Sequence, residues 1–375
     1  MNYQNKQQQK VIIGDAEFSG NMKVLRKYHD NPDVKKYLVP DGTVEIADHA
    51  FCGCACLEEI ILTDSVKVIS RYAFSGCTSL KTIVIPGVQR IHEDAFNDCA
   101  ALQYVELPDT METISSNAFC DCTSLKAIKM PHSLKNLGDN AFNRCMSLVS
   151  VAIPHGLKVI PDHAFCSCQS LKTVVLPEGV VEIEGNAFTN CVSLERVEMP
   201  NTIERVDHHA FNLCSSIATV VFSTSLKEIG NSAFSNCSML KQALLPDSLE
   251  VIGHHAFSRC SSLKDIRFPE KLKTIPSNAF DHCYSLEFIE IPHSIEEVCA
   301  YSFSTCSRLK HVSVCPGTIV QDEAFYRCPP LKNIRKYNRQ HRGFPVVSGV
   351  LGRDPAGHLR PLLCAGAGAA GVPHG

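Results

Sequence analysis

The sequence predicts an elongated repeat solenoid of about thirteen coils, with a parallel β-sheet on one face and turns with short 3₁₀ or helical segments on the other. Three observations predict this fold class. The pair Ala-Phe, or Ser-Phe once, recurs at a step of 23 residues, with two steps of 22. A Cys follows each of these Phe residues by three positions, and a Leu follows each Cys by three, except at Ile217. Units with such a fixed period bury a continuous core only by stacking on their neighbours.

The Phe and Cys positions therefore define two columns, which we expect to point into the core. The Phe column comprises Phe51, Phe74, Phe96, Phe119, Phe142, Phe165, Phe188, Phe211, Phe234, Phe257, Phe280, Phe303 and Phe325. The Cys column comprises Cys54, Cys77, Cys99, Cys122, Cys145, Cys168, Cys191, Cys214, Cys237, Cys260, Cys283, Cys306 and Cys328.

Within each unit, the run L-x-x-I-x-I-P predicts a short strand. Leu80, Ile83 and Ile85 show its alternation, which is typical of a strand with one buried face. Pro86 follows, and because Pro cannot donate a backbone hydrogen bond, it ends the strand. A second run, L-x-x-I, packs the returning side of the coil. The residues before Ala-Phe are mostly Asn, Asp, Gly, Ser and His, which favour turns.

This pattern, as in AFNRCMSLVSVAIP at residues 141–154, resembles the leucine-rich repeats of the BspA-like (Treponema pallidum) type. The resemblance covers roughly residues 31–335. Proteins of this family are similar to adhesins and surface-interaction proteins of bacteria and protists. The resemblance therefore implies binding rather than catalysis.

Three segments are predicted along the chain. Residues 1–30 form an N-terminal cap or a flexible segment, and residues 31–336 form the solenoid. Residues 337–375 are first basic and then rich in Gly and Ala, a composition typical of a disordered tail. We expect a monomer.

Composition argues against several classes of protein. The net charge is −3 and no long block of one sign occurs, which disfavours a nucleic-acid binder. No stretch approaches the ~20 apolar residues of a membrane span, and the N-terminus shows no signal peptide. We therefore expect a cytoplasmic protein, with the cell surface or secretion by a route without a signal as the alternative.

The twenty cysteines allow three interpretations: disulfides, metal ligands or a buried structural row. Side chains in one column stay parallel at ~4.8 Å, wider than the Cβ spacing of a disulfide and unable to converge on a metal. A buried row, with thiols bonded weakly to the backbone of the next coil, is the favoured interpretation. Cys52, Cys120 and Cys166 share the position after Phe, where we expect exposure and leave redox activity open. Exposed thiols fit a reducing compartment.

The histidines raise the question of a metal site, because HHAFNLC (208–214) and HHAFSRC (254–260) repeat a His-His pair near a Cys. His163, His209 and His255 fall in every second coil, so their backbones should lie ~10 Å apart. Zinc holds its nitrogen ligands at ~2.1 Å, so polar turn residues are the favoured interpretation. We expect neither a metal nor a cofactor.

Function is expected on the sheet, where residues between the buried strand positions point outward and are free to vary. We predict a non-catalytic scaffold for an unidentified protein partner; no nucleotide loop, H-E-x-x-H motif or nucleophile elbow is present. The alternatives are a surface adhesin or host-interaction protein and, more remotely, a thiol- or metal-using enzyme. The predicted partner-binding residues are Tyr104, Glu106, Lys129, Arg196, Glu198, Leu244, Asp265, Arg267, Phe288 and Glu290.

Overall fold

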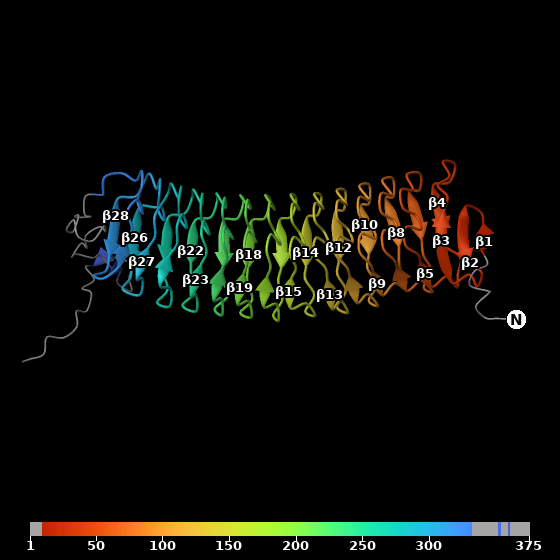
Figure 1. Ribbon diagram of the computed structural model, residues 1–375, viewed down its shortest axis with the longest axis horizontal. Helices are drawn as coiled ribbons and strands as arrows, with labels where there is room; N and C mark the ends of the chain where they lie inside the picture. The colour runs from red at the N-terminus through yellow and green to blue at the C-terminus, as the bar shows by residue number, and fades with distance from the viewer. Residues whose placement is uncertain (1–9, 332–351, 354–358, 361–375) are drawn as a thin grey trace, which may run out of the picture.

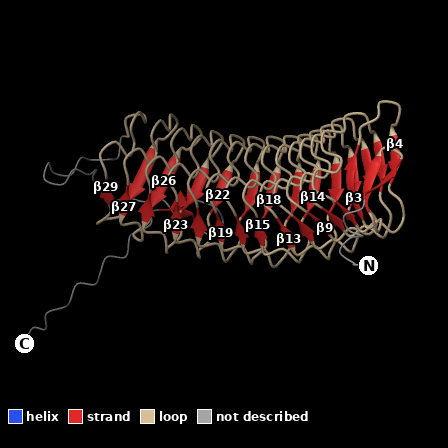
Figure 2. Cartoon of the chain, turned by 45° about the vertical axis from the view of Figure 1, so that its right-hand side comes forward, coloured by secondary structure: helices blue, strands red, loops and turns tan. Residues whose placement is uncertain are grey.

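The structure, a computed structural model, describes residues 10–331, 352–353 and 359–360. Residues 10–331 form a long, gently curved rod of stacked coils, with the chain advancing from one end to the other (Figures 1 and 2). The predicted solenoid of about thirteen turns is therefore confirmed. The predicted tail at residues 337–375 lies outside the described residues, apart from the antiparallel pair β30 (Gly352–Arg353) and β31 (Leu359–Arg360).

Each coil contributes one strand to a ladder that we call the long-strand ladder. Equivalent positions pair in parallel from coil to coil, as Val105 pairs with Ile128, so each column of the sequence becomes a column in space. The ladder comprises β4 (Lys36–Leu38), β6 (Glu59–Ile61), β8 (Thr82–Val84), β10 (Tyr104–Glu106), β12 (Ala127–Lys129), β14 (Ser150–Ala152), β16 (Thr173–Val175), β18 (Arg196–Glu198), β20 (Thr219–Val221), β22 (Gln242–Leu244), β24 (Asp265–Arg267), β26 (Phe288–Ile291) and β28 (His311–Val314).

The returning side of the coils differs from the prediction. No helix or 3₁₀ segment occurs in residues 10–331; turns and a second parallel ladder of two-residue strands, the short-strand ladder, stand there instead. Many backbone N–H groups on this side donate to the preceding coil, as Gln89 does to the Lys67 carbonyl at 2.8 Å, and the bonds within a coil are isolated turns, such as that from Met111 to the Pro108 carbonyl at 2.9 Å. The ladder comprises β5 (Glu45–Ile46), β7 (Val68–Ile69), β9 (Arg90–Ile91), β11 (Thr113–Ile114), β13 (Asn136–Leu137), β15 (Val159–Ile160), β17 (Glu182–Ile183), β19 (Arg205–Val206), β21 (Glu228–Ile229), β23 (Val251–Ile252), β25 (Thr274–Ile275), β27 (Glu297–Val298) and β29 (Ile319–Val320).

A turn around Ala-Phe links the coils a third time. The residue before Ala adopts a left-handed conformation in every full coil, with φ between 55° and 67°, and the residue before Cys does so as well. This conformation directs backbone N–H groups along the rod: His209 donates to Asn231 at 2.8 Å and Leu213 to Ser235 at 2.9 Å. The predicted turn is therefore present, and its bonds satisfy backbone groups that would otherwise be buried without partners.

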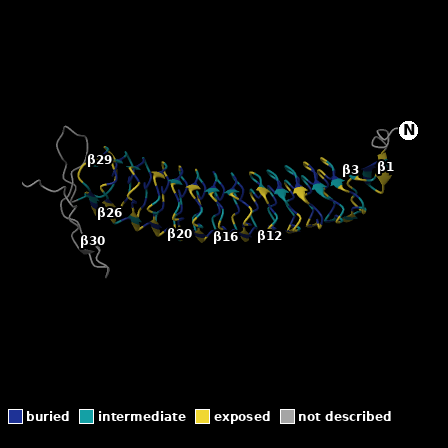
Figure 3. Ribbon diagram, turned by 90° about the horizontal axis from the view of Figure 1, so that it is seen from below, coloured by how far each residue is buried: buried dark blue, intermediate teal, exposed yellow. Residues whose placement is uncertain are grey.

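The core follows the predicted columns (Figure 3). Column phenylalanines from Phe51 to Phe303 are 0% exposed, and Phe325 in the last coil is 8% exposed. Neighbouring rings stack with centroids 4.9–5.5 Å apart, at interplanar angles of 2–18°. Because each ring contacts the rings of both adjacent coils, the column joins the coils into one continuous core.

An antiparallel unit covers the N-terminal end of the rod. It consists of β1 (Lys10–Ile13), β2 (Ala16–Ser19) and β3 (Val24–Tyr28), and β3 also pairs in parallel with β5. Tyr28 takes the place of a column Phe, since its ring stacks on Phe51 at 5.1 Å. Phe18 and Leu25 are fully buried beside it. These residues shield the first coil from water, as the end of a repeat array requires.

Candidate interaction surface

The long-strand ladder presents one continuous outward face. Its strands contain a buried middle residue between two outward-pointing residues, as Tyr104 and Glu106 are exposed on either side of buried Val105. All ten residues predicted from the sequence to bind a partner lie on this face, and all ten are exposed. Their partner-binding role stays a prediction.

The structure brings these ten residues together in three groups rather than one. Tyr104, Glu106 and Lys129 lie on β10 and β12, where Glu106 is in register with Lys129. Arg196 and Glu198 on β18 form an ion pair with each other at 2.5 Å. The remaining residues, on the adjacent strands β22, β24 and β26, form the third group: Leu244, Asp265, Arg267, Phe288 and Glu290.

The third group combines apolar and charged side chains at high exposure. Leu244 is 64% exposed and lies in register with Arg267, whose side chain is 77% exposed. Phe288 is 54% exposed, and its ring stacks on His311 at 5.2 Å with an interplanar angle of 3°. An exposed aromatic ring and an arginine are residue types that are enriched at protein interfaces, and here an exposed Leu adds apolar area beside them.

Sequence reasoning missed one column of this face. The residue just before each strand is also exposed in most coils, and it is Lys at 35, 81, 126, 172, 241, 264 and 310. The signal was present, because this position directly follows the buried Leu of every unit and varies freely. It was overlooked because the two-residue alternation of the strand begins one residue later.

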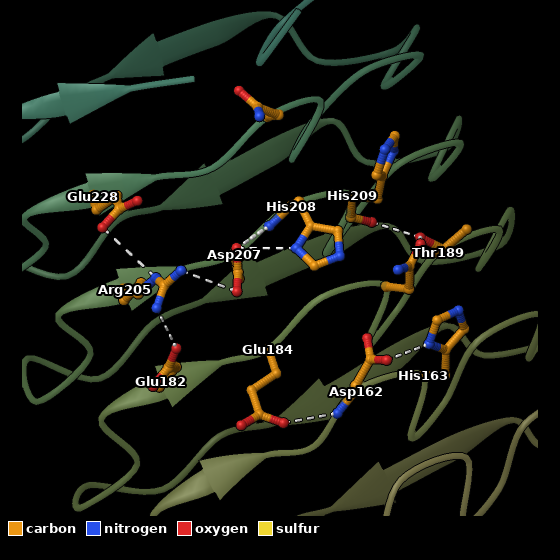
Figure 4. Close-up of polar contacts among 12 residues, drawn as sticks. Asp162, His163, Glu182, Glu184, Thr189, Arg205, Asp207, His208, His209 and Glu228 are labelled. Carbon is orange, nitrogen blue, oxygen red and sulfur yellow. Dashed lines mark hydrogen bonds and ion pairs between the residues drawn. The ribbon is translucent and has the colours of Figure 1, made fainter. Parts of the chain in front are cut away.

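The short-strand ladder carries a network of ion pairs that joins three adjacent coils (Figure 4). Arg205 on β19 lies within 3.2 Å of Glu182 on β17, 3.1 Å of Asp207 and 3.6 Å of Glu228 on β21. Ion pairs such as Lys135–Glu112 at 3.0 Å and Lys227–Glu204 at 2.7 Å join other adjacent coils. This side of the rod thus satisfies much of its charge internally.

The histidines lie on the turns, as predicted. His163 contacts Asp162 at 2.8 Å and His208 contacts Asp207 at 3.1 Å, so each pairs with its neighbour in the sequence (Figure 4). The His208 ring also fills the space above Gly185, where an added Cβ would lie 2.3 Å from the ring. Burial, with the adjacent His208, lowers the pKa of His209. Among the described residues, no three His, Cys, Asp or Glu side chains converge as metal ligands would.

The Cys column is a buried row of free thiols that bond to the backbone. Twelve of its thirteen thiols donate to the Phe carbonyl of the preceding coil at Sγ···O distances of 3.0–3.3 Å. Burial raises the pKa of Cys122 and Cys168 well above the ordinary value and that of Cys54 to about 12. The thiol therefore acts here as a small core residue and a weak donor.

The expectation of exposure after Phe is correct at only one of three positions. Cys52 is exposed, Cys166 is half-buried and Cys120 is 9% exposed. The place directly after Phe in the repeat does not by itself determine exposure. Cys52 lies in the first full coil, whereas Cys120 and Cys166 lie in inner coils whose neighbouring turns cover them. Burial, together with nearby Asp121, raises the pKa of Cys120 to about 12, which disfavours the reactive thiolate.

Comparison with known proteins agrees with this architecture. The family model described as BspA type leucine rich repeat region (6 copies) matches residues 44–160, 135–250 and 237–340. A leucine rich cell surface protein of Faecalibacterium prausnitzii is similar, with 25% identity, a TM-score of 0.53 and coverage of 89% of this chain and 96% of that one. A leucine-rich repeat protein of Bacteroides ovatus shares 23% identity, with a TM-score of 0.56 and coverage of 84% and 88%.

Two further findings complete the comparison. No curated protein matches the chain. The described part of the chain contains no helix that could span a membrane.

Proposed function

Since the chain belongs to the family of BspA type leucine-rich repeats, we propose that it is a non-catalytic scaffold that binds a protein partner along the outward face of the long-strand ladder. The observation that carries this proposal is the separation of roles between columns. Middle strand residues are uniformly apolar and nearly all buried, whereas the outward residues vary and are exposed on nearly all of the thirteen strands, those of β6 and Ser313 on β28 being partly exposed. Solenoids use such extended surfaces to bind partners.

The anchors of this interface are Leu244 and Phe288, with Arg267 between their strands. Exposed apolar side chains of this size on a sheet face lose more water on binding than the small polar residues elsewhere on it. An arginine beside them adds directional hydrogen bonds to a partner's carboxylates or carbonyls. We therefore assign the centre of the interface to β22, β24 and β26.

Affinity capture tests this assignment. The variant Leu244→Ala with Phe288→Ala should bind the partner of the intact chain at least about thirtyfold more weakly, since two truncations of at least about 1 kcal/mol each sum to about 2 kcal/mol. A matched control is Val251→Ala with Ile319→Ala on the short-strand ladder, where the residues are 50% and 62% exposed. The control should bind normally. Equal recovery by both double variants would remove the case for the long-strand face.

A surface adhesin is the second candidate, and one comparison favours it. The similar protein of F. prausnitzii is described as a cell surface protein. Free thiols throughout the described coils instead favour a reducing compartment, and thus the cytoplasm. Labelling intact cells with an impermeant amine reagent separates the two, because the many exposed lysines react only if the protein is outside. Labelling comparable to that of a known surface protein would establish the adhesin.

A further inference from the structure

The middle of the long-strand face carries a patch that the candidate anchors do not include. On β12, β14 and β16, the outward positions and the column just before each strand hold three lysines, six uncharged residues and no carboxylate. All nine are exposed. We call this set the central basic patch: Lys126, Ala127, Lys129, Val149, Ser150, Ala152, Lys172, Thr173 and Val175.

The three lysines of the central basic patch form no ion pair within the described part of the chain. Two other lysines in the same column as Lys126 and Lys172 are neutralised by the adjacent coil: Lys81 lies 2.6 Å from Glu58, and Lys310 lies 2.8 Å from Glu287. Acidic residues flank the patch, with Glu106 on β10 in register with Lys129 and Glu195 next to Lys172 in the following coil, but none of the three lysines is paired with them among the described residues.

The surface between these lysines is smooth and partly apolar. Ala127, Ser150, Ala152 and Thr173 have short side chains, so the main chain of a bound segment can approach the sheet closely. Val175 is 61% exposed and Val149 is 45% exposed. Apolar surface of this kind favours a ligand that carries small aliphatic groups as well as negative charge.

We propose that the central basic patch binds an extended, acidic segment of a partner protein, with carboxylates at the three lysines and aliphatic side chains on Val149 and Val175. This inference rests on the proposed scaffold function and specifies the chemistry of the partner. A sulfated polysaccharide or an anionic membrane would match the charge, but neither offers small aliphatic side chains to the two valines. The patch lies several coils from Leu244 and Phe288, so the two sites make separate contributions.

The spacing of the lysines suits an extended chain. Lys126 and Lys172 occupy equivalent positions two coils apart, which corresponds to ~10 Å along the rod. An extended polypeptide advances ~6.8 Å for every two residues, and its alternate side chains point to the same side. With the reach of the flexible lysine stems, acidic residues at alternate positions can meet more than one lysine at once.

The test uses a fluorescent peptide of two Glu-Ser-Glu-Ser-Val-Ser units, whose Glu and Val side chains point to the same side of an extended chain, and a matched peptide of two Gln-Ser-Gln-Ser-Val-Ser units, with binding followed by anisotropy. The full chain should bind the Glu peptide and not the Gln peptide, and raising the salt from about 50 to about 200 mM should weaken binding. The variant Lys126→Gln, Lys129→Gln and Lys172→Gln should bind about tenfold more weakly, the sum of three exposed ion pairs.

A matched variant on the other side, Lys135→Gln, Lys158→Gln and Lys227→Gln, removes the same charge and should bind the Glu peptide as the intact chain does. Equal weakening by both triple variants would overturn the proposal, because net charge would then explain binding. Lysine-dependent binding of heparin or of phosphatidylserine vesicles, with none of the Glu peptide, would also overturn it. If the Glu peptide does not bind while partner capture still depends on Leu244 and Phe288, the proposed scaffold function is supported and the proposal for the central basic patch is wrong.

Discussion

The substitution Phe188→Ala probes the stacked core most sharply. Phe188 is 0% exposed, and its ring lies 5.5 Å from Phe165 and 5.3 Å from Phe211. A buried Phe removes at least ~150 Å² of surface from water, or ~4 kcal/mol at ~25 cal/mol per Å². The Ala that replaces Phe188 is still buried and keeps part of this burial free energy. The cavity and the two lost ring contacts add to the destabilisation. We expect a loss of about 3–5 kcal/mol, as is typical of Phe→Ala in a core.

The assay is urea unfolding of the full chain followed by circular dichroism, with Phe288→Ala as the control. Phe288 is 54% exposed, so its replacement should cost less than ~0.5 kcal/mol. Because coils contact only their neighbours, hydrogen exchange should accelerate around β14 to β20 and stay unchanged near β6. A cost for Phe188→Ala as small as that of the control would refute the stacked column.

Three further predictions follow from the thiols and the turns. In the native protein at neutral pH, dithionitrobenzoate should react rapidly with exposed Cys52, whereas the fully buried column thiols should react only after unfolding; rapid native reaction of Cys168 would contradict its burial. Burial raises the pKa of Cys122 and Cys168 above 9.0, so their contribution to stability is complete below about pH 9 and is lost as the pH rises further, because the unfolded thiols ionise first. The melting temperature of the intact chain should therefore fall more steeply between about pH 9 and about pH 10.5 than the melting temperature of the variant Cys122→Ala with Cys168→Ala. Leu213→Asn should stabilise the fold by up to about 1 kcal/mol in urea unfolding, because Leu213 has a φ of 62° and Asn tolerates this conformation better; a loss of stability would show that its side chain matters more than its backbone.

Much of the fold was predictable because the repeat fixes which residues are equivalent. Once Phe188 and Phe211 occupy the same column, parallel stacking and burial follow for the whole column. The direction of the outward residues followed in the same way, since Val105 must be buried if Tyr104 and Glu106 are exposed. Strand alternation and register therefore required no information beyond the sequence.

Other features depend on contacts that no single unit contains. The return segment has only two strand residues per coil, as at Val159–Ile160, too few for periodicity to separate a strand from a helical turn. Leu213 and Thr305 adopt left-handed conformations that their residue types do not favour, because hydrogen bonds to the next coil hold them there. The burial of Cys120 likewise arises from the surrounding turns.

The sequence predicted that binding residues lie on the outward face of the long-strand ladder, but it did not predict how they divide into separate patches on that face. Charge neutralisation depends on which side chains meet in space, and Arg196 was chosen before its pairing with Glu198 on the same strand was visible. Lys126 and Lys172 became candidates only when the outward positions of β12, β14 and β16 were seen together to carry no carboxylate. Pairing across coils, rather than residue type, thus decides which charges are left for a partner.

Hydroxyl-radical footprinting of the native chain, read by mass spectrometry, tests most directly whether equivalent residues form buried columns. Tyr104, Leu244 and Phe288 should be oxidised quickly, since they are 48%, 64% and 54% exposed, while the column rings of Phe188 and Phe211 should be protected until the chain unfolds. Oxidation of Phe188 or Phe211 in the folded protein at the rate of Phe288 would contradict the stacked-coil account.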